Sequence, residues 1–239
     1  MSTKENRTRL SEAIVALARL ADTLRGPDGC PWDAAQNDDS IKLYLLEEAY
    51  EVLDAVEMGD PDAVCSELGD LLFQIVFLAQ LATERGEFDL ADVVERIYEK
   101  MVRRHPHVFG EEKASRPEEV AKRWAEIKRE EDGGEDLERI PAALPALLRA
   151  HRLGERASKL ELESKSKNPG FDFLKPDIEA LKAATLSGEK GEVSGALGRL
   201  LFNLAQFSRR WGLNAEDLLR RENVKKANNW QKKINSSGE

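Results

Sequence analysis

The fold of this 239-residue chain is decided by residues 47–70, which read EEAYEVLDAVEMGDPDAVCSELGD. Apolar residues recur at helical spacing on both sides of Gly59-Asp60-Pro61. That tripeptide has the residue order of a helix C-terminus, a new N-cap and a first helical position. The segment therefore predicts two antiparallel helices, from about residue 39 or 40 to 58 and from 61 to about 85, joined by a tight turn.

Helical spacing continues along the rest of the chain, with Gly and Pro at the expected ends, and no convincing strand pattern is found. Residues 28–33 are too rich in turn residues to be helical, and residues 164–172 are expected to form a loop. Further helices are expected at about 8–24, 90–104, 117–131, 145–163, 177–187, 192–211 and 214–233. The predicted fold class is all-α.

An internal repeat divides the chain. The sequence ELGDLLF at residues 67–73 is echoed by ALGRLLF at residues 196–202, an offset of 129. Residues 133–143 are rich in Gly and acids, which is typical of a linker. We therefore expect two tandem helical modules, residues 1–132 and 144–239. The alternative is that two helical segments with LLF runs resemble each other by chance.

Charge is distributed unevenly between the two parts of the chain. Residues 1–140 contain 18 basic and 33 acidic residues, a net charge of −15, whereas residues 141–239 contain 18 basic and 12 acidic residues, a net charge of +6. An acidic surface repels nucleic acid unless a cation intervenes. The composition therefore predicts no direct nucleic-acid binding and makes metal binding in the first part worth testing.

Composition also argues against several classes of protein. Charged residues make up 34% of the chain, and we expect no window of about 18 apolar residues and hence no membrane span. The N-terminal segment lacks the apolar core of a signal peptide, so a cytoplasmic location is expected. Two cysteines and three histidines disfavour a disulfide framework, a structural zinc site and a zinc enzyme.

Acidic residues on the two hairpin helices form the strongest chemical signal. Glu48 and Glu51 share one helix face, as do Glu67 and Asp70, and both faces also carry apolar residues. In a hairpin centred on Gly59, residues whose numbers sum to 118 lie level, which places Glu48 opposite Asp70 and Glu51 opposite Glu67. Four converging carboxylates repel one another unless a cation is present, and all-oxygen ligation favours Mg²⁺ or Mn²⁺. The alternative is a solvated face of two charged helices.

A metal held by carboxylates is typical of phosphoryl chemistry. Such a site also needs cations for phosphate and an aromatic surface for a base. Lys100, Arg103 and Arg104 end one predicted helix and are candidate phosphate contacts, although basic residues also suit a helix C-terminus. Trp32 and Trp124 are candidate base contacts, or else anchors of a core or an interface.

Four motifs together resemble the MazG nucleoside triphosphate pyrophosphohydrolases: GCPWDxxQ at 29–36, YLLEEAYE at 44–51, ELGDLL at 67–72 and RRHPHVF at 103–109. The similarity covers most of residues 7–131 and extends loosely to GFDF at 170–173. It implies an all-α NTP-pyrophosphatase fold whose helical bundle is completed in a homodimer. It also implies Mg²⁺-dependent hydrolysis of nucleoside triphosphates between the α and β phosphates, giving NMP and pyrophosphate.

The resemblance also implies roles for individual residues. Glu48, Glu51, Glu67 and Asp70 correspond to the Mg²⁺ ligands. Glu47, beside the catalytic candidate Glu48, is either an outer-shell acceptor or the base that orients the attacking water. The residues expected to contact the nucleotide are Lys100, Arg103 and Arg104 on the phosphate side, Trp124 and Lys128 closing over it, and Trp32.

The second module departs from the family pattern, because Ala180, Ala196 and Arg199 stand where acids are expected and only Asp177 keeps a carboxylate. Activity is therefore expected in the first module, with a broad base preference and a role in nucleotide-pool housekeeping or stress response. A dUTP- or dCTP-restricted hydrolase and a phosphoribosyl-ATP pyrophosphohydrolase are alternatives within the enzyme class. Outside it, the alternative is a non-catalytic nucleotide-sensing or partner-binding helical dimer.

Overall fold

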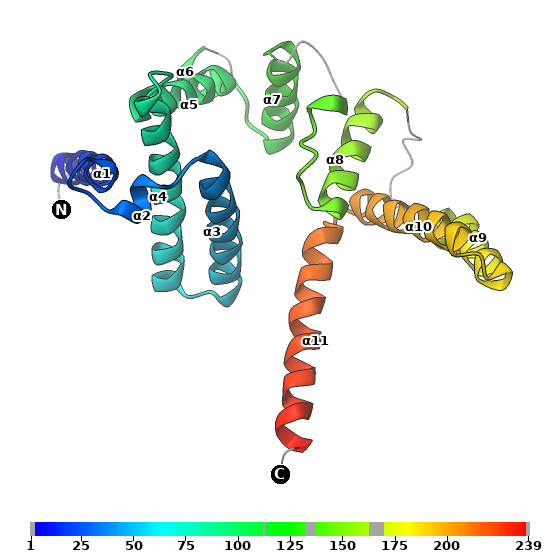
Figure 1. Ribbon diagram of the computed structural model, residues 1–239. Helices are drawn as coiled ribbons and strands as arrows, with labels where there is room; N and C mark the ends of the chain where they lie inside the picture. The colour runs from blue at the N-terminus through cyan, green and yellow to red at the C-terminus, as the bar shows by residue number, and fades with distance from the viewer. Residues whose placement is uncertain (1–2, 112, 132–136, 163–169, 238–239) are drawn as a thin grey trace. The chain divides into compact units, whose positions relative to one another are not determined.

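A computed structural model describes residues 3–111, 113–131, 137–162 and 170–237 (Figure 1). Over these residues the chain is helical without any strand, which confirms the all-α prediction. The helices are α1 Thr3–Arg25, α2 Pro31–Ala34, α3 Asp38–Met58, α4 Pro61–Glu84, α5 Leu90–Arg104, α6 Pro106–Phe109, α7 Pro117–Glu131, α8 Ala146–Lys159, α9 Lys175–Ser187, α10 Lys190–Arg210 and α11 Ala215–Ser237, with 3₁₀ turns η1 Leu137–Arg139 and η2 Phe171–Phe173.

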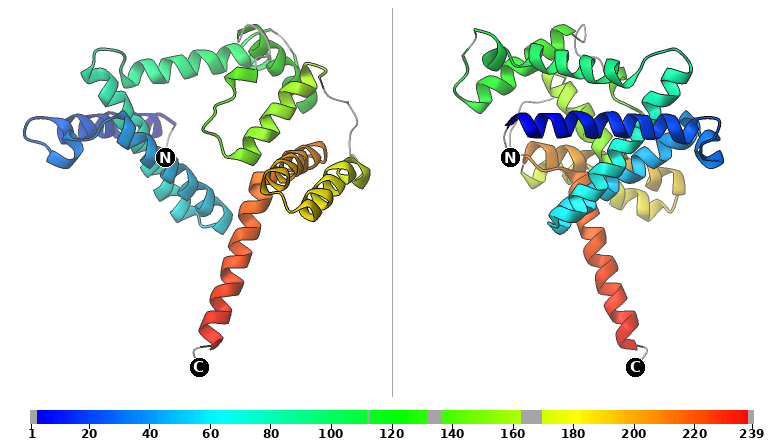
Figure 2. Two further views of the ribbon diagram at one scale, coloured as in Figure 1. Left: turned by 45° about the vertical axis from the view of Figure 1, so that its right-hand side comes forward. Right: turned by 90° about the vertical axis from the view of Figure 1, so that its left-hand side faces the viewer.

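The turn between α3 and α4 forms as the sequence predicts. Gly59 has a left-handed backbone, with φ of 71°, and its N–H donates to the carbonyl of Ala55 at 3.2 Å. The side chain of Asp60 accepts from the N–H of Asp62 at 3.0 Å, and Pro61 is the first helical residue. These contacts close both helix ends, so α3 and α4 run antiparallel and side by side (Figure 2).

Two local predictions need correction. Residues 28–33 were expected to be non-helical, but Pro31–Ala34 form one helical turn, because Pro at the first position presets the required φ. Likewise Pro106 starts the short helix α6 instead of only ending α5. Residues 133–136 of the expected linker and 164–169 of the expected loop lie outside the described residues, and the remaining residues of these segments include η1 and the start of η2.

The chain divides into two compact units, residues 1–124 and 125–239. In the first unit, Ile41 of α3 packs with Phe77 and Leu81 of α4 to form the core, and α1 packs against α4. In the second, α9 and α10 form the corresponding hairpin, with α8 and α11 against α10. Its turn glycine, Gly188, has φ of 73° and lies 129 residues after Gly59, the offset of the sequence repeat.

The sequence-based expectation that no apolar window is long enough to span a membrane is wrong for α4, which passes that test by length and composition. A core helix of a soluble protein passes the same test. Only 22% of the apolar window in α4 is buried within this chain, so much of its apolar surface remains to be covered. Because α4 also packs against α1 and α3 and carries Glu67 and Asp70, the test is weak evidence for a membrane span.

The turn geometry leads to a stability prediction. We expect Gly59→Ala to lower the free energy of unfolding by about 1 kcal/mol, because a side chain disfavours the left-handed backbone. Gly69→Ala is the matched control, since Gly69 is helical and exposed, and a methyl group added there would have no atom within 4 Å, so this change should stabilise the helix. Urea denaturation of both variants measures the difference, and equal effects of the two substitutions would contradict the prediction.

Candidate functional site

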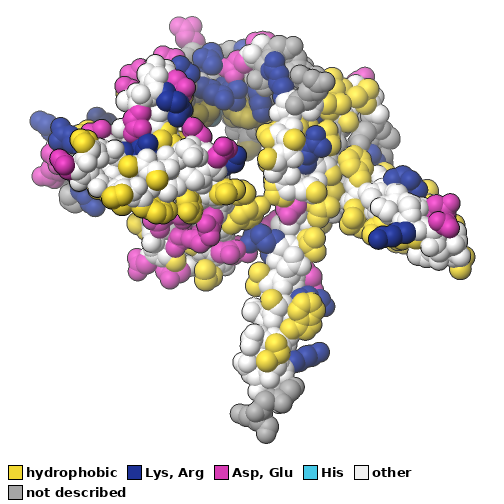
Figure 3. Space-filling view, in the orientation of Figure 1, with side chains coloured by type: hydrophobic (Ala, Val, Ile, Leu, Met, Phe, Trp, Pro, Cys, Tyr) yellow, Lys and Arg dark blue, Asp and Glu magenta, His cyan; other side chains and the backbone are white. Residues whose placement is uncertain are grey.

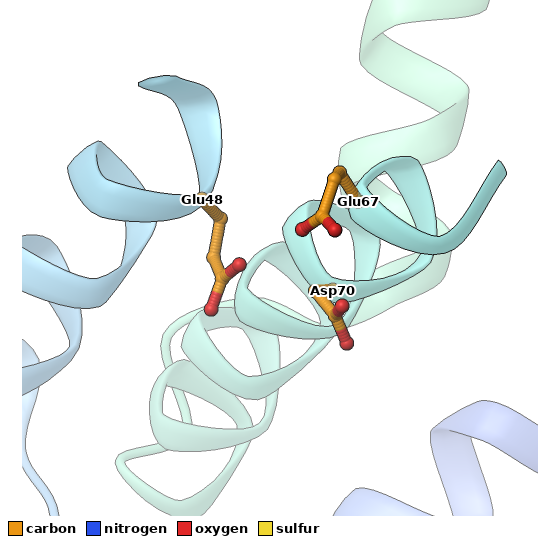
Figure 4. A group of neighbouring side chains, drawn as sticks. All are labelled: Glu48, Glu67 and Asp70. Carbon is orange, nitrogen blue, oxygen red and sulfur yellow. The ribbon is translucent and has the colours of Figure 1, made fainter. Parts of the chain in front are cut away.

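Three acidic side chains meet between α3 and α4. One carboxylate oxygen from each of Glu48, Glu67 and Asp70 lies within 4.8 Å of the other two. Figure 4 shows the Glu48 side chain extending from α3 toward the two acids on α4. Figure 3 shows acidic side chains gathered over the half of the hairpin nearest its turn, beside exposed apolar ones. The structure therefore brings together three of the four predicted metal ligands.

The register of the hairpin places these acids. Ile41 and Phe77, whose numbers sum to 118, are buried to 2% and 1% exposure in one core cluster. Glu48 and Asp70 obey the same sum two helical turns nearer the Gly59 turn, so they lie level across the helix pair. The apolar core at one end and the glycine turn at the other thus hold the acids in register.

The fourth predicted ligand, Glu51, lies next to the group. Its side chain is within hydrogen-bonding reach of Glu67, as expected for two residues whose numbers sum to 118. Its charge also acts on Glu48. Partial burial, followed by the charges of Glu51, Asp70 and Glu67, raises the pKa of Glu48 above its ordinary value. Partial burial and the proximity of Glu51 likewise raise the pKa of Glu67. Each shift combines the cost of partly burying a carboxylate with the cost of placing like charges together.

The donor set fits a hard divalent cation. All the nearby acidic groups offer carboxylate oxygens, and no His or Cys belongs to the group. Opposite ligands of an octahedral Mg²⁺ ion lie roughly 4.2 Å apart, twice the ion–oxygen distance, so small side-chain rotations would bring these oxygens to one ion. Glu47 directly precedes Glu48 on α3 and is exposed, so its carboxylate lies outside the group.

Tyr44 lies one helical turn from Glu48 and contacts a second aromatic residue, Trp32. Trp32 of α2 is 57% exposed, and its ring lies 6.0 Å from that of Tyr44, centroid to centroid. Tyr44 precedes Glu48 by four residues on α3, so the two share a face. The exposed face of Trp32 is therefore placed on the side of the hairpin that carries the acids.

The basic candidates lie elsewhere in the chain. Lys100, Arg103 and Arg104 occupy the C-terminal end of α5, which crosses the end of α4 remote from the Gly59 turn (Figure 1). Along α4 alone, the 14 residues from Asp70 to Glu84 span roughly 21 Å. The structure thus does not bring these cations to the acids within the first unit of one chain.

Trp124 lies with the basic residues and not with the acids. The guanidinium of Arg104 is 5.1 Å from the centre of its ring, and Arg104 is only 5% exposed. Lys128 follows Trp124 by one turn of α7. Arg104 is therefore held by a cation–π contact, while Lys100 remains half-buried and Arg103 exposed.

Sequence reasoning did not assign two residues that contact either an acid of the site or the loop that carries Trp32. Gln74 of α4 hydrogen-bonds Glu48 and counteracts part of the rise in its pKa. Arg25, at the end of α1, binds the loop that carries Trp32 through backbone carbonyls. Gln74 could have been found, because 44 and 74 also sum to 118 and place it level with Tyr44, one turn after Asp70. Backbone contacts such as those of Arg25 leave no sequence signal.

The second unit keeps the hairpin but not the acid cluster. Asp177, the counterpart of Glu48, accepts a hydrogen bond from Asn203, the counterpart of Gln74, at 2.7 Å. Ala196 replaces Glu67 and is buried, and Arg199 replaces Asp70. The carboxylate–amide pair therefore persists where the other acids do not.

Comparisons with known proteins find relatives over most of this chain. The family model of the MazG nucleotide pyrophosphohydrolase domain matches residues 36–109, which include all four acids. The nucleoside triphosphate pyrophosphohydrolase of Escherichia coli K12 is 39% identical over 89% of this chain and 83% of its own length. The nucleoside triphosphate pyrophosphohydrolase/pyrophosphatase MazG of Thermotoga maritima is 37% identical over 86% of this chain and 79% of its own.

The raised pKa values lead to a prediction about stability and pH. A carboxyl group whose pKa is raised by folding destabilises the folded state at neutral pH, and this effect disappears as the pH falls through the raised pKa. We therefore expect Glu67→Gln to raise the melting temperature at neutral pH in EDTA, with the gain shrinking in acid. Mg²⁺ should stabilise the parent protein more than the variant.

Glu87→Gln is the control with the opposite sign. A hydrogen bond from Arg85 lowers the pKa of Glu87, so its charge stabilises the fold at neutral pH and stops doing so as the pH falls through the lowered pKa. Melting curves over a pH series measure both differences. A lower melting temperature for metal-free Glu67→Gln at neutral pH would show that the acids do not repel.

Proposed function

Because the chain belongs to the MazG nucleotide pyrophosphohydrolase family, we propose that it hydrolyses nucleoside triphosphates between the α and β phosphates, giving NMP and pyrophosphate. The reaction uses Mg²⁺, for which Mn²⁺ can substitute, and accepts several bases. The observation that carries this proposal is the group formed by Glu48, Glu67 and Asp70, whose oxygens lie within 4.8 Å inside the family-matched segment. Housekeeping of the cytoplasmic nucleotide pool, or a stress response, is the role we propose.

We assign metal binding and activation of water to different acids. Glu48, Glu51, Glu67 and Asp70 hold the cation, whose chemistry is to polarise phosphate oxygens and activate water. Glu47, exposed beside Glu48, accepts a proton from the attacking water or orients it. Gln74 donates to Glu48 and keeps its carboxylate turned toward α4. The raised pKa values of Glu48 and Glu67 fall back when the cation binds, because the cation removes the repulsion.

In this proposal, a second copy of the chain supplies the cationic side chains that bind phosphate. The cations of α5 are remote from the acids in one chain, so we propose that Lys100 and Arg103 bind phosphate at the site of a partner subunit. Trp124, against which Arg104 is buried, and Lys128 would close over the nucleotide. The outer apolar residues of the hairpin provide a contact surface for that partner. They are Leu43, Leu46, Tyr50 and Leu53 of α3 and Leu68, Leu72 and Ile75 of α4, all exposed.

Loss of a ligand tests the proposed chemistry. We expect Glu48→Gln and Asp70→Asn each to lower pyrophosphate release from ATP and dNTPs by at least about 100-fold, since even outer partners of a metal site contribute 10- to 100-fold. Asp177→Asn in the second unit is the matched control and should leave activity unchanged. No turnover by the parent protein would favour a non-catalytic nucleotide-binding protein, and equal turnover in parent and variants would refute the site assignment.

The proposed dimer can be tested by mass and activity together. We expect a native mass of twice the 26.8 kDa chain, and Leu53→Glu should produce a monomer of low activity because it places a charge in the apolar contact. Leu186→Glu is the control, since Leu186 is 88% exposed in the second unit. A fully active monomer would show that one chain holds the whole site.

A further inference from the structure

A single side chain fixes the loop between α1 and α3. The Nη1 of Arg25 donates to the backbone carbonyls of Asp33, at 2.5 Å, and Gln36, at 3.2 Å. Its Nε and Nη2 bind the two carboxylate oxygens of Glu84 on α4, both at 2.7 Å. The Arg25 side chain is only 8% exposed. One guanidinium therefore joins the loop to the framework helix that also carries Glu67 and Asp70.

The same guanidinium rests on the core. It lies 5.3 Å from the centre of the Phe77 ring, and Phe77 is 1% exposed in the core cluster with Ile41. The planar fork of Arg can bind a carboxylate on one edge and carbonyls on the other while stacking on a ring, whereas the ammonium of Lys cannot do all three. This position requires Arg for geometric reasons, beyond its charge.

The loop path is also restricted at Gly29. A Cβ at this residue would lie 2.4 Å from the carbonyl oxygens of both Thr23 and Leu24, so no other residue fits without a backbone shift. The next residue, Cys30, donates its N–H to the Leu24 carbonyl at 2.8 Å. The loop is thus closed tightly onto the end of α1, independently of Arg25.

The loop that these contacts hold carries an exposed aromatic residue, Trp32. Trp32 lies between Gly29 and the two carbonyls that Arg25 binds, and the side chain of Gln36 donates to its carbonyl at 2.9 Å. The indole itself is 57% exposed against Tyr44, so the tightly held backbone does not serve to bury it. Adding one helical turn to the ring separation puts the indole roughly 12 Å from Glu48, a distance that a ribose and base attached to a metal-bound α-phosphate can span.

We propose that Arg25 is a positioning residue for nucleotide recognition, which holds the loop so that Trp32 presents its indole to the base of the bound nucleotide. This inference rests on the proposed function, because it assumes a nucleotide whose phosphates lie at the acids. Stacking on an indole tolerates every base, which agrees with a broad base preference. The pocket for the base is then set by the loop and not by the acidic hairpin.

The test compares Arg25→Lys, Gly29→Ala and Trp32→Ala, alone and combined. Each single change should raise KM for ATP about tenfold and leave kcat within about twofold, because one base–aromatic contact is lost. Arg25→Lys combined with Trp32→Ala should have the KM of Trp32→Ala alone, since Arg25 acts through Trp32. Inhibition by inorganic triphosphate, which has no base, should be the same in all variants.

Two matched controls separate recognition from stability. Arg85→Lys changes a different Arg, the residue that follows α4. Arg85 pairs with Asp38 and Glu87 but binds no carbonyl of the loop. Trp230→Ala removes another exposed indole, in the second unit. Neither should change KM.

Calorimetric binding of α,β-methylene-ATP with Mg²⁺ makes the test independent of turnover. If the parent protein binds this analogue without hydrolysing ATP, and the three variants bind it about tenfold more weakly, the proposed function fails and the inference about Arg25 holds. Unchanged affinity in Arg25→Lys and Gly29→Ala, with only a lower melting temperature, would reduce Arg25 to a structural role. Additive effects with Trp32→Ala, or a monomer produced by Trp32→Ala, would also overturn the inference.

Discussion

Mutual repulsion among carboxylates held between two helices is the constraint on which the rest of this structure depends. Glu48, Glu67 and Asp70 are kept within 4.8 Å by a hairpin that cannot relax, because a left-handed glycine closes one end and an apolar core closes the other. Partial burial and this repulsion together raise the pKa values of Glu48 and Glu67. The cation and the substrate that we propose for this site would account for a fold that maintains such a group at a cost in stability.

The second unit shows the same framework without the conflict. Its hairpin turns at Gly188 and keeps a carboxylate–amide pair, Asp177 with Asn203, but buries Ala196 where the first unit has Glu67. The hydrogen bond between Asp177 and Asn203 is stable without metal, since it joins an acceptor to a donor. The comparison separates two roles within one hairpin. The carboxylate–amide pair links the two helices, and the additional acids are the residues that we propose bind a cation.

Helix ends and hairpin register were predictable because they depend on local chemistry. Gly59, Asp60 and Pro61 have the residue types favoured at the end of one helix, at the N-cap of the next and at its first position. In the resulting helical hairpin, residues whose numbers sum to 118 lie level, which aligned Glu48 with Asp70. The one-turn helix at Pro31 was missed because composition alone does not distinguish a turn-rich loop from a single helical turn. The apolar length of α4 was also missed, because Glu67 and Asp70 interrupt the apolar residues of that segment.

The sequence by itself determined the helices, the hairpin and the identity of the acids, because helical periodicity and cap chemistry act over a few residues. Only the tertiary structure decided which residues share the site. It separated Lys100 and Arg103 from the acids, because α5 follows the far end of α4. It also brought Arg25 to the loop that carries Trp32. Every residue has a backbone carbonyl, so the sequence does not indicate which carbonyls a guanidinium binds. These contacts are defined only once the chain has folded.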